Sequence, residues 1–288
     1  MTAPAIPADE RTSWVPPLPL IGVKFLELRK RRTLMIVTVA FTVGLPVIFY
    51  GIRLPYHLGD PARYGPAGAP GAFATAGTLM GEFGFIAAVA LGVTAGTADL
   101  TDGMFRHLVI TGRSRLALYV ARIPAGLSII GSLAAVAFTM TCLVTAFLGG
   151  PQADSAASAV HVSAGDMVRS GLWLELYLAV GFMVGLGLSS LMGQRTVPVV
   201  LLVVLEIIIT PVLADHPLPF FLNGERVVVG IALDQLKPAA LAGGTTVGPS
   251  GGLVHLPPMP TWAMITVIVG WIVGWTAIGA WKMATRDA

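Results

Sequence analysis

The sequence predicts an all-α polytopic membrane protein with six transmembrane helices and an amphipathic interfacial helix before the first of them. Of its 288 residues, 55% are hydrophobic and only 11% are charged, and the mean hydropathy is +0.80. Soluble proteins carry about 25% charged residues. The chain also contains apolar runs of about 20 residues, the length that crosses a hydrocarbon core about 30 Å thick. This composition excludes a soluble enzyme, a disulfide scaffold and a disordered chain.

Six apolar runs satisfy the length requirement for a crossing. They are 33–52, 79–98, 123–148, 172–192, 197–213 and 261–281. The first run follows a basic cluster and has no small-residue cleavage site behind it, so we expect a retained helix and not a cleaved signal peptide. The sequence therefore predicts a cytoplasmic N-terminus over 1–32 and a single transmembrane domain over 33–288.

Lysine and arginine residues orient the predicted spans, because positive charges resist translocation. With the N-terminus inside, thirteen of the 18 fall on the cytoplasmic side: Arg11, Lys24, Arg29, Lys30, Arg31, Arg32, Arg106, Arg113, Arg115, Arg122, Arg195, Lys282 and Arg286. The others are Arg53, Arg63, Arg169, Arg226 and Lys237. We expect a multi-pass protein of the plasma (inner) membrane with both termini in the cytoplasm. Spans rich in Ala, Gly and Val suit a bacterial membrane.

A helical repeat of apolar residues precedes the first span. Its members are Leu18, Ile21, Phe25 and Leu28, with charged residues at other positions around the helix. This pattern predicts a helix in the inner membrane interface, with the apolar stripe in lipid and the basic residues at anionic headgroups. The alternative is a plain basic anchor whose only role is to orient the chain.

The inner loop 99–115 starts with acids, continues with a hydrophobic row and ends with basic residues. These are Asp99, Asp102, Met104, Phe105, Leu108, Arg113 and Arg115. Acids at the start and bases at the end favour a short helix, and the hydrophobic row favours contact with another molecule. The alternative is a solvated cytoplasmic loop whose basic residues only help to orient the chain in the membrane.

This loop resembles one in a known family of transporters. The order Asp99, Asp102–Phe105, Thr111–Arg115 and Ala121–Arg122 is similar to the loop between the second and third helices of ABC-2 type transporter permeases. Those permeases are the membrane subunits of ATP-binding cassette exporters. The sequence departs from the family pattern at Met104, where threonine is usual, and in lacking a proline-led turn.

The resemblance implies a specific role for the loop and specific partners. The loop is expected to be a coupling helix that docks on a separate ATP-binding cassette subunit, which holds the ATP and Mg²⁺. The chain is expected to pair as a homodimer, or as a heterodimer with a similar permease. A drug, lipid or natural product is the substrate class that the resemblance implies.

The chain itself has no motif for binding ATP. A Walker A loop needs Gly-Lys-Ser/Thr, and none of the four lysines (Lys24, Lys30, Lys237 and Lys282) follows a glycine. Metalloprotease and serine-hydrolase motifs are also absent, and the five histidines all fall in predicted loops. We expect a transport subunit, with no enzyme activity, cofactor, metal or nucleic-acid partner of its own. A non-transporting membrane anchor or enzyme is an alternative.

Three acids fall within the predicted spans, Glu82, Glu175 and Glu206. Each costs about 3 kcal/mol at the membrane midplane if it is charged and unpaired. One interpretation is an acidic lining of a substrate pathway in the outer half of the membrane, or a proton-coupled carrier that uses Glu206. In the other, Glu82 and Glu175 reach the headgroups while Glu206 is neutral or hydrogen-bonded within the bundle.

Two further features concern packing and the outer side. Glycine pairs four residues apart predict close helix crossings: Gly77 with Gly81, Gly92 with Gly96, Gly181 with Gly185, and Gly270 with Gly274. The long outer segment 214–260 contains an apolar stretch at 227–233 that is too short to span a membrane. We expect a short helix there, lying on or dipping into the outer leaflet.

Overall fold

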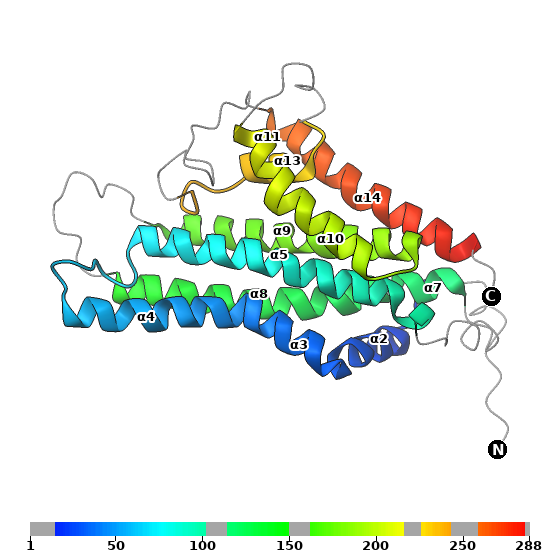
Figure 1. Cartoon of the computed structure of the whole chain (residues 1–288), viewed down its shortest axis with the longest axis horizontal. Coiled ribbons are helices and arrows are strands. Elements are labelled where there is room, and N and C mark those ends of the chain that lie inside the picture. Colours follow the sequence, from blue (N-terminus) through cyan, green and yellow to red (C-terminus); the bar gives the residue numbers. More distant parts are fainter. Residues whose placement is uncertain (1–14, 102–113, 150–161, 216–225, 243–258, 286–288) are drawn as a thin grey trace.

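A computed structural model of the protein describes residues 15–101, 114–149, 162–215, 226–242 and 259–285 (Figure 1). Within these ranges all regular secondary structure is helical, as predicted. Five helical segments are long and apolar enough to cross a membrane: Arg32–Gly59, Pro70–Ala98, Arg115–Leu148, Ala164–Met192 and Thr261–Thr285. They correspond to five of the six predicted spans.

The remaining predicted span, 197–213, is a shorter apolar helix over Thr196–Val212. It comprises α10 (Thr196–Val204), the π-helical segment η2 (Leu205–Ile209) and the start of α11 (Thr210–Asp215). It follows a tight turn at Gly193, the left-handed C-cap of α9, whose φ is 70°. The described structure therefore contains five helices of spanning length, and a sixth crossing stays a prediction.

Several helices extend beyond the predicted apolar runs. The first comprises α3 (Arg32–Val39), η1 (Ala40–Gly44) and α4 (Leu45–Gly59). The others are α5 (Pro70–Thr101), α7 (Arg115–Val120) with α8 (Arg122–Leu148), α9 (Ala164–Met192) and α14 (Thr261–Thr285). Local capping explains one extension, because Ser163 and Asp166 form a capping box that starts α9 eight residues before the predicted run.

Helices α5 and α9 pack against each other along the middle of the bundle (Figure 1). Their backbones touch at glycines: a Cβ added at Gly92 would collide with the Phe182 carbonyl oxygen, and one added at Gly185 would lie 2.9 Å from the Val89 carbonyl oxygen. The predicted close crossing is confirmed at these positions. Gly270 differs, since a Cβ there would meet nothing within 4 Å, and the same holds for Gly274.

The other long helices lie around this central pair. Figure 1 shows α4 and α8 on one side of it, and α10 and α14 on the other. Most of α5 and α9 is buried, whereas only a minority of residues in α3–α4, α8 and α14 is buried, and these helices carry apolar residues on their outer faces. Examples are Ile48, Val136 and Val269. Exposed apolar faces of this kind suit contact with lipid, which is compatible with a membrane protein.

Helix ends that the predicted topology assigns to the cytoplasm gather at one end of the bundle, here called the α2 end. They are α2 (Leu18–Lys30), the last turns of α5, α7, the α9–α10 turn and the end of α14. Arg115 Nη1, for example, donates to the Ala284 carbonyl oxygen at 3.3 Å. At the opposite end, here called the α4 end, Gly68 donates its amide hydrogen to the Leu148 carbonyl oxygen at 3.0 Å.

A short helix, α13 (Val229–Gln235), lies in the segment predicted to contact the outer leaflet. Its first five residues are buried, and it packs against α14. The Trp173 indole on α9 donates to the Leu233 carbonyl oxygen at 2.8 Å. A short helix was predicted in this segment, and its first five residues are covered by protein, while its position relative to the outer leaflet stays a prediction. Residues 243–258 of this segment lie outside the described ranges.

Candidate functional site

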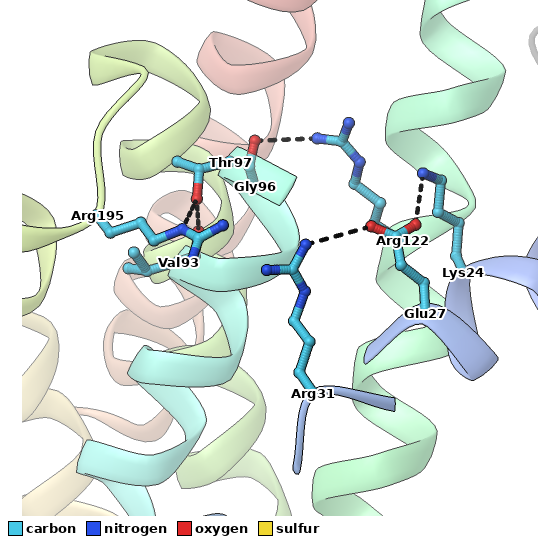
Figure 2. Close-up of polar contacts among 8 residues, drawn as sticks. All are labelled: Lys24, Glu27, Arg31, Val93, Gly96, Thr97, Arg122 and Arg195. Atoms are coloured by element: carbon cyan, nitrogen blue, oxygen red, sulfur yellow. Dashed lines mark hydrogen bonds and ion pairs between the residues drawn. The ribbon is translucent and has the colours of Figure 1, made fainter. Parts of the chain in front are cut away.

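Charged side chains meet at the α2 end of the bundle, as Figure 2 shows. We call this group the charged junction and define it as Lys24, Glu27, Arg31, Arg122 and Arg195. Lys24 and Glu27 lie on α2, and Arg31 joins α2 to α3. Arg122 is the first residue of α8, and Arg195 lies in the α9–α10 turn. Polar contacts here join α5 to α8 and to the α9–α10 turn, and Glu27 pairs with Lys24 within α2 and with Arg31 at its end.

Helix α2 packs on the bundle with a face that contains a lysine. Leu20, Lys24 and Leu28 are buried on successive turns, and Leu20 packs against Ala117, Leu118 and Ala121. The sequence predicted Leu18, Ile21, Phe25 and Leu28 as the apolar stripe and placed Lys24 at the headgroups. Leu28 is buried, Ile21 and Phe25 are half-buried, and Leu18 is 82% exposed. The predicted position of Lys24 is therefore wrong.

An acidic neighbour makes the burial of Lys24 possible. Glu27 Oε2 lies 2.9 Å from Lys24 Nζ, and Glu27 Oε1 lies 3.8 Å from Arg31 Nη2. Burying an ammonium group without a counter-charge costs several kcal/mol of desolvation free energy. Glu27 therefore stabilises the docked position of α2 and links it to the turn into α3.

Arg122 connects α8 to the end of α5 by a hydrogen bond. Its side chain is 1% exposed, and Nη1 donates to the Gly96 carbonyl oxygen at 3.0 Å. Arg122 also lines a small cavity together with Lys24 and Glu27. A guanidinium is favourable here because the C-terminal end of a helix carries a partial negative charge.

Arg195 approaches the end of α5 from another direction. Its Nε donates to Thr97 Oγ1 at 3.1 Å, and that hydroxyl donates to the Val93 carbonyl oxygen at 2.9 Å. Figure 2 shows Arg122 and Arg195 reaching the adjacent residues Gly96 and Thr97 from different elements. The last turns of α5 are thus held by one guanidinium from α8 and another from the α9–α10 turn.

The predicted coupling loop begins directly after this point. Asp99 lies in the last turn of α5, whereas Asp102, Met104, Phe105, Leu108 and Arg113 fall outside the described residues. Arg115 is the first residue of α7 and contacts the end of α14. The structure shows both attachment points of the loop, and the role of its hydrophobic row stays a prediction.

A second polar group surrounds Glu206 in η2. Tyr177 donates its hydroxyl hydrogen to Glu206 Oε1 at 2.7 Å. The Tyr177 ring stacks on Trp173 at a centroid distance of 5.1 Å. Gly230 of α13 lies so close that a Cβ there would be 2.6 Å from Glu206 Oε2. π-Helical segments occur frequently at functional sites, and here one carries Glu206, which is half-buried and hydrogen-bonded to Tyr177.

The other two acids do not join Glu206. Glu82 is exposed on α5, and Glu175 lies beside Gly131 of α8, where a Cβ would be 3.0 Å from Glu175 Oε2. Because Glu175 precedes Tyr177 by two positions on a helix, the two side chains point to different sides of α9. The interpretation of all three acids as one pathway lining gains no support from this arrangement.

Sequence reasoning selected none of the five charged-junction residues as site residues, and it also missed Tyr177. Arg195 was counted only as a cytoplasmic charge, although its place in a tight turn after a long helix was a usable signal. Tyr177 carried no signal, because its contact with Glu206 depends on how α9 and η2 face each other. In the described ranges no three His, Cys, Asp or Glu side chains gather as a metal site requires.

No protein-family model and no curated protein sequence matches this chain. Function is therefore inferred from the two polar groups, the helical architecture and the sequence patterns around them.

Proposed function

We propose that the chain is the membrane-spanning permease subunit of an ABC exporter, driven by ATP that a separate subunit hydrolyses. The charged junction is the observation that carries this proposal. It fastens the end of α5, where the loop 99–115 begins, to α8 and to the α9–α10 turn. A loop that receives force from a partner needs such an anchor, because a frayed helix end would absorb the displacement.

The packing also suits transmission of a rigid-body movement. Helices α5 and α9 touch backbone to backbone at Gly92 and Gly185, so they resist sliding past each other. A displacement of the loop would reach α8 through Arg122 and α10 through Arg195, and would then move the helices together. In this mechanism the bundle alternates between inward-facing and outward-facing arrangements as the ATP-binding subunits close and open.

The proposal includes the partners that the resemblance implied. Two permease chains, identical or similar, would assemble with two ATP-binding cassette subunits, which hold ATP and Mg²⁺. Helix α2 would lie at the cytoplasmic membrane interface with exposed residues such as Leu18, Val23 and Leu26 toward lipid. The substrate would be a drug, lipid or natural product, moved across the plasma membrane.

Co-purification tests the proposal most directly. The tagged full chain is isolated from its native membrane and the proteins that remain bound are identified by mass spectrometry. We expect an ATP-binding cassette subunit in the complex, and we expect Phe105→Ala to lower its recovery about tenfold or more, since truncating a buried aromatic anchor commonly costs about 2 kcal/mol. Phe147→Ala is the matched control, because Phe147 is 80% exposed near the other end of the bundle.

A chain that retains no ATP-binding subunit in native membranes would contradict the proposal. Full recovery with Phe105→Ala would remove the docking role of the loop. An equal loss of recovery with Phe147→Ala would show that loss of any exposed aromatic residue damages the complex. That result would also remove the docking role of the loop.

A proton-coupled carrier that uses Glu206 is the second candidate function. The hydrogen bond between Tyr177 and Glu206 inside the helix bundle favours it, because acids placed among membrane helices commonly relay protons. Transport into vesicles that follows an imposed proton gradient without ATP would support this candidate over the exporter. Absence of both an ATPase partner and transport would favour the third class, a membrane anchor or enzyme.

A further inference from the structure

A groove of ≈ 410 Å³ lies at the α4 end of the bundle, away from both polar groups described above. We call it the arginine groove. It is lined by Phe49, Ile52, Arg53, Tyr56, Arg63, Tyr64 and Gly65. Its residues lie at one end of the first membrane-crossing helix, whose other end adjoins the charged junction.

Local structure builds the groove. Phe49, Arg53 and Tyr56 are spaced three and four residues apart, so they share one face of α4. The chain then folds back, because the Asp60 carbonyl oxygen accepts the Tyr64 amide hydrogen at 3.0 Å. As a result Tyr64 packs on Tyr56 with a centroid distance of 5.0 Å.

Two further contacts fix the turn that follows α4 and forms one wall of the groove. His57 Nδ1 lies 2.7 Å from the Tyr64 carbonyl oxygen. The Arg63 amide donates to Asp60 Oδ1 at 3.2 Å. These bonds hold the Arg63 and Tyr64 backbone against α4, so the wall of the groove is formed by short-range contacts and needs no ligand to assemble.

Two guanidinium groups give the groove its charge. The Arg53 guanidinium carbon lies 6.0 Å from the Phe49 ring centroid, and that of Arg63 lies 5.5 Å from the Tyr64 ring centroid. Within the described ranges neither arginine forms an ion pair, and Arg53 Nε is buried without a hydrogen-bond partner. A buried donor of this kind is stabilised by an anion, and a pair of arginines matches phosphate oxygens in geometry as well as charge.

The surroundings indicate an amphiphilic anion. Aromatic residues at the end of a membrane helix belong at the level of the lipid headgroups. Ile52 in the groove wall and Ile48 one turn before it are 55% and 58% exposed, and they continue the apolar surface of α4 toward the hydrocarbon core. A ligand held by its phosphate at Arg53 and Arg63 would therefore lay its acyl chains along this helix face.

We propose that the arginine groove binds the phosphate headgroup of an anionic phospholipid. The guanidinium groups hold the phosphate oxygens, the tyrosine rings flank the headgroup, and the acyl chains cover the exposed face of α4. This site is separate from the predicted coupling loop and from Glu206, and it does not depend on whether the chain is driven by ATP.

Lipid binding to the purified full chain in detergent tests the proposal. Dioctanoyl phosphatidylglycerol is titrated and its dissociation constant is measured by calorimetry, with native mass spectrometry to count bound lipids. We expect Arg63→Gln and Arg53→Gln each to weaken binding about tenfold, since a charge-assisted hydrogen bond contributes about 1.5–3 kcal/mol. Arg63 is exposed on a turn, so its replacement tests the site without disturbing the helix.

Controls separate the headgroup from other sources of binding. Arg169→Gln removes another exposed arginine, on α9, and is expected to leave the dissociation constant unchanged. Dioctanoylglycerol has the same chains without phosphate, and we expect at least tenfold weaker binding. Inorganic phosphate lacks the chains, and we expect it to compete only at much higher concentration.

Three results would overturn the proposal. Unchanged lipid binding by the Arg63→Gln protein would remove the groove as the site. Equal binding of dioctanoylglycerol would show that the chains alone are recognised. Inorganic phosphate that binds as tightly as the lipid would identify a free-anion site and exclude the assigned lipid headgroup.

Discussion

Arg195 and Thr97 are 98 residues apart in the sequence, yet Arg195 Nε donates to Thr97 Oγ1 at 3.1 Å. This bond ties the α9–α10 turn to the last turns of α5. Because Gly193 ends α9 with a left-handed cap, the chain reverses there and presents Arg195 to α5. The contact joins the two helices of the central pair at the end where the predicted coupling loop begins.

Replacing Arg195 with methionine should loosen the end of α5. The change removes the charge-assisted hydrogen bond from Arg195 Nε to the Thr97 hydroxyl, so we expect a loss of about 1–3 kcal/mol. The apparent melting temperature of the purified protein measures this loss. In the proposed exporter the same variant should keep its ATP-binding subunit and show less transport for each ATP hydrolysed.

Gln194→Met is the control for that variant, because Gln194 is exposed in the same turn. We expect the control to match the unmodified protein in both measurements. Arg195→Met with unchanged melting and unchanged coupling would contradict the role assigned to the contact.

Replacing Glu27 with glutamine should destabilise the docked position of α2. Lys24 is buried, and loss of the neighbouring carboxylate leaves its ammonium without that counter-charge. Since Glu27 is itself 28% exposed, we expect a moderate cost of about 1–3 kcal/mol in unfolding free energy. Protease sensitivity of residues 15–31 in the purified protein gives a local measurement of the release of α2.

A double variant separates charge from packing at this pair. Lys24→Met combined with Glu27→Gln removes both charges and keeps a long apolar side chain on the buried face, so we expect part of the stability to return. Lys30→Met changes an exposed lysine on the same helix and should have little effect. A double variant less stable than Glu27→Gln alone would show that the ion pair is not what holds α2.

Adding a methyl group at Gly92 should damage the central helix pair. An alanine Cβ there would collide with the Phe182 carbonyl oxygen, which belongs to a helix backbone and cannot rotate away. We expect Gly92→Ala to lose about 1–3 kcal/mol or to reduce the folded yield. Gly274→Ala is the matched control, because a Cβ at Gly274 meets nothing within 4 Å and alanine favours a helix over glycine by about 1 kcal/mol.

The opposite ranking would contradict this account. A tolerated Gly92→Ala would mean that α5 and α9 separate easily. A destabilising Gly274→Ala would mean that α14 has a neighbour outside the described chain, such as a second permease copy.

The apolar runs predicted the long helices well but not their ends. Hydropathy reports which residues suit lipid, whereas Ser163 and Asp166 begin α9 through a capping box outside the apolar run. The buried face of α2 was missed for a related reason. A hydropathy pattern assigns Lys24 to water, and its burial depends on a pair with Glu27 that the pattern does not weigh.

Contacts between segments far apart in the chain could not be predicted from the sequence pattern. Glu206 stood out as an acid in an apolar run, but its bond to Tyr177 depends on the rotation of two helices about their own axes. The same limit applies to the arginine groove. Arg53 and Arg63 were seen only as charges on the outer side, and the turn at Asp60 is what brings their region into one groove.

Cysteine labelling in intact cells should show the α4 end outside and the α2 end inside, because the basic residues favour this orientation. In a Cys142→Ala background, Ala62→Cys and Gln194→Cys place single thiols at exposed positions at the two ends. We expect an impermeant reagent to label Ala62→Cys in intact cells and Gln194→Cys only after permeabilisation. The reverse pattern would overturn the predicted topology.

Replacing Glu206 with glutamine tests which driving force the bundle uses. The amide oxygen can still accept the Tyr177 hydroxyl hydrogen, so we expect the protein to fold with a loss of about 1 kcal/mol or less. In an ATP-driven exporter this variant should keep its ATP-binding subunit bound, and any change should appear only in transport. Tyr177→Phe removes the donor and leaves the carboxyl group, which separates loss of the hydrogen bond from loss of the acid. If Glu206→Gln alone abolishes transport while Tyr177→Phe retains it, and transport follows a proton gradient without ATP, the proton-coupled carrier becomes the better description of this chain.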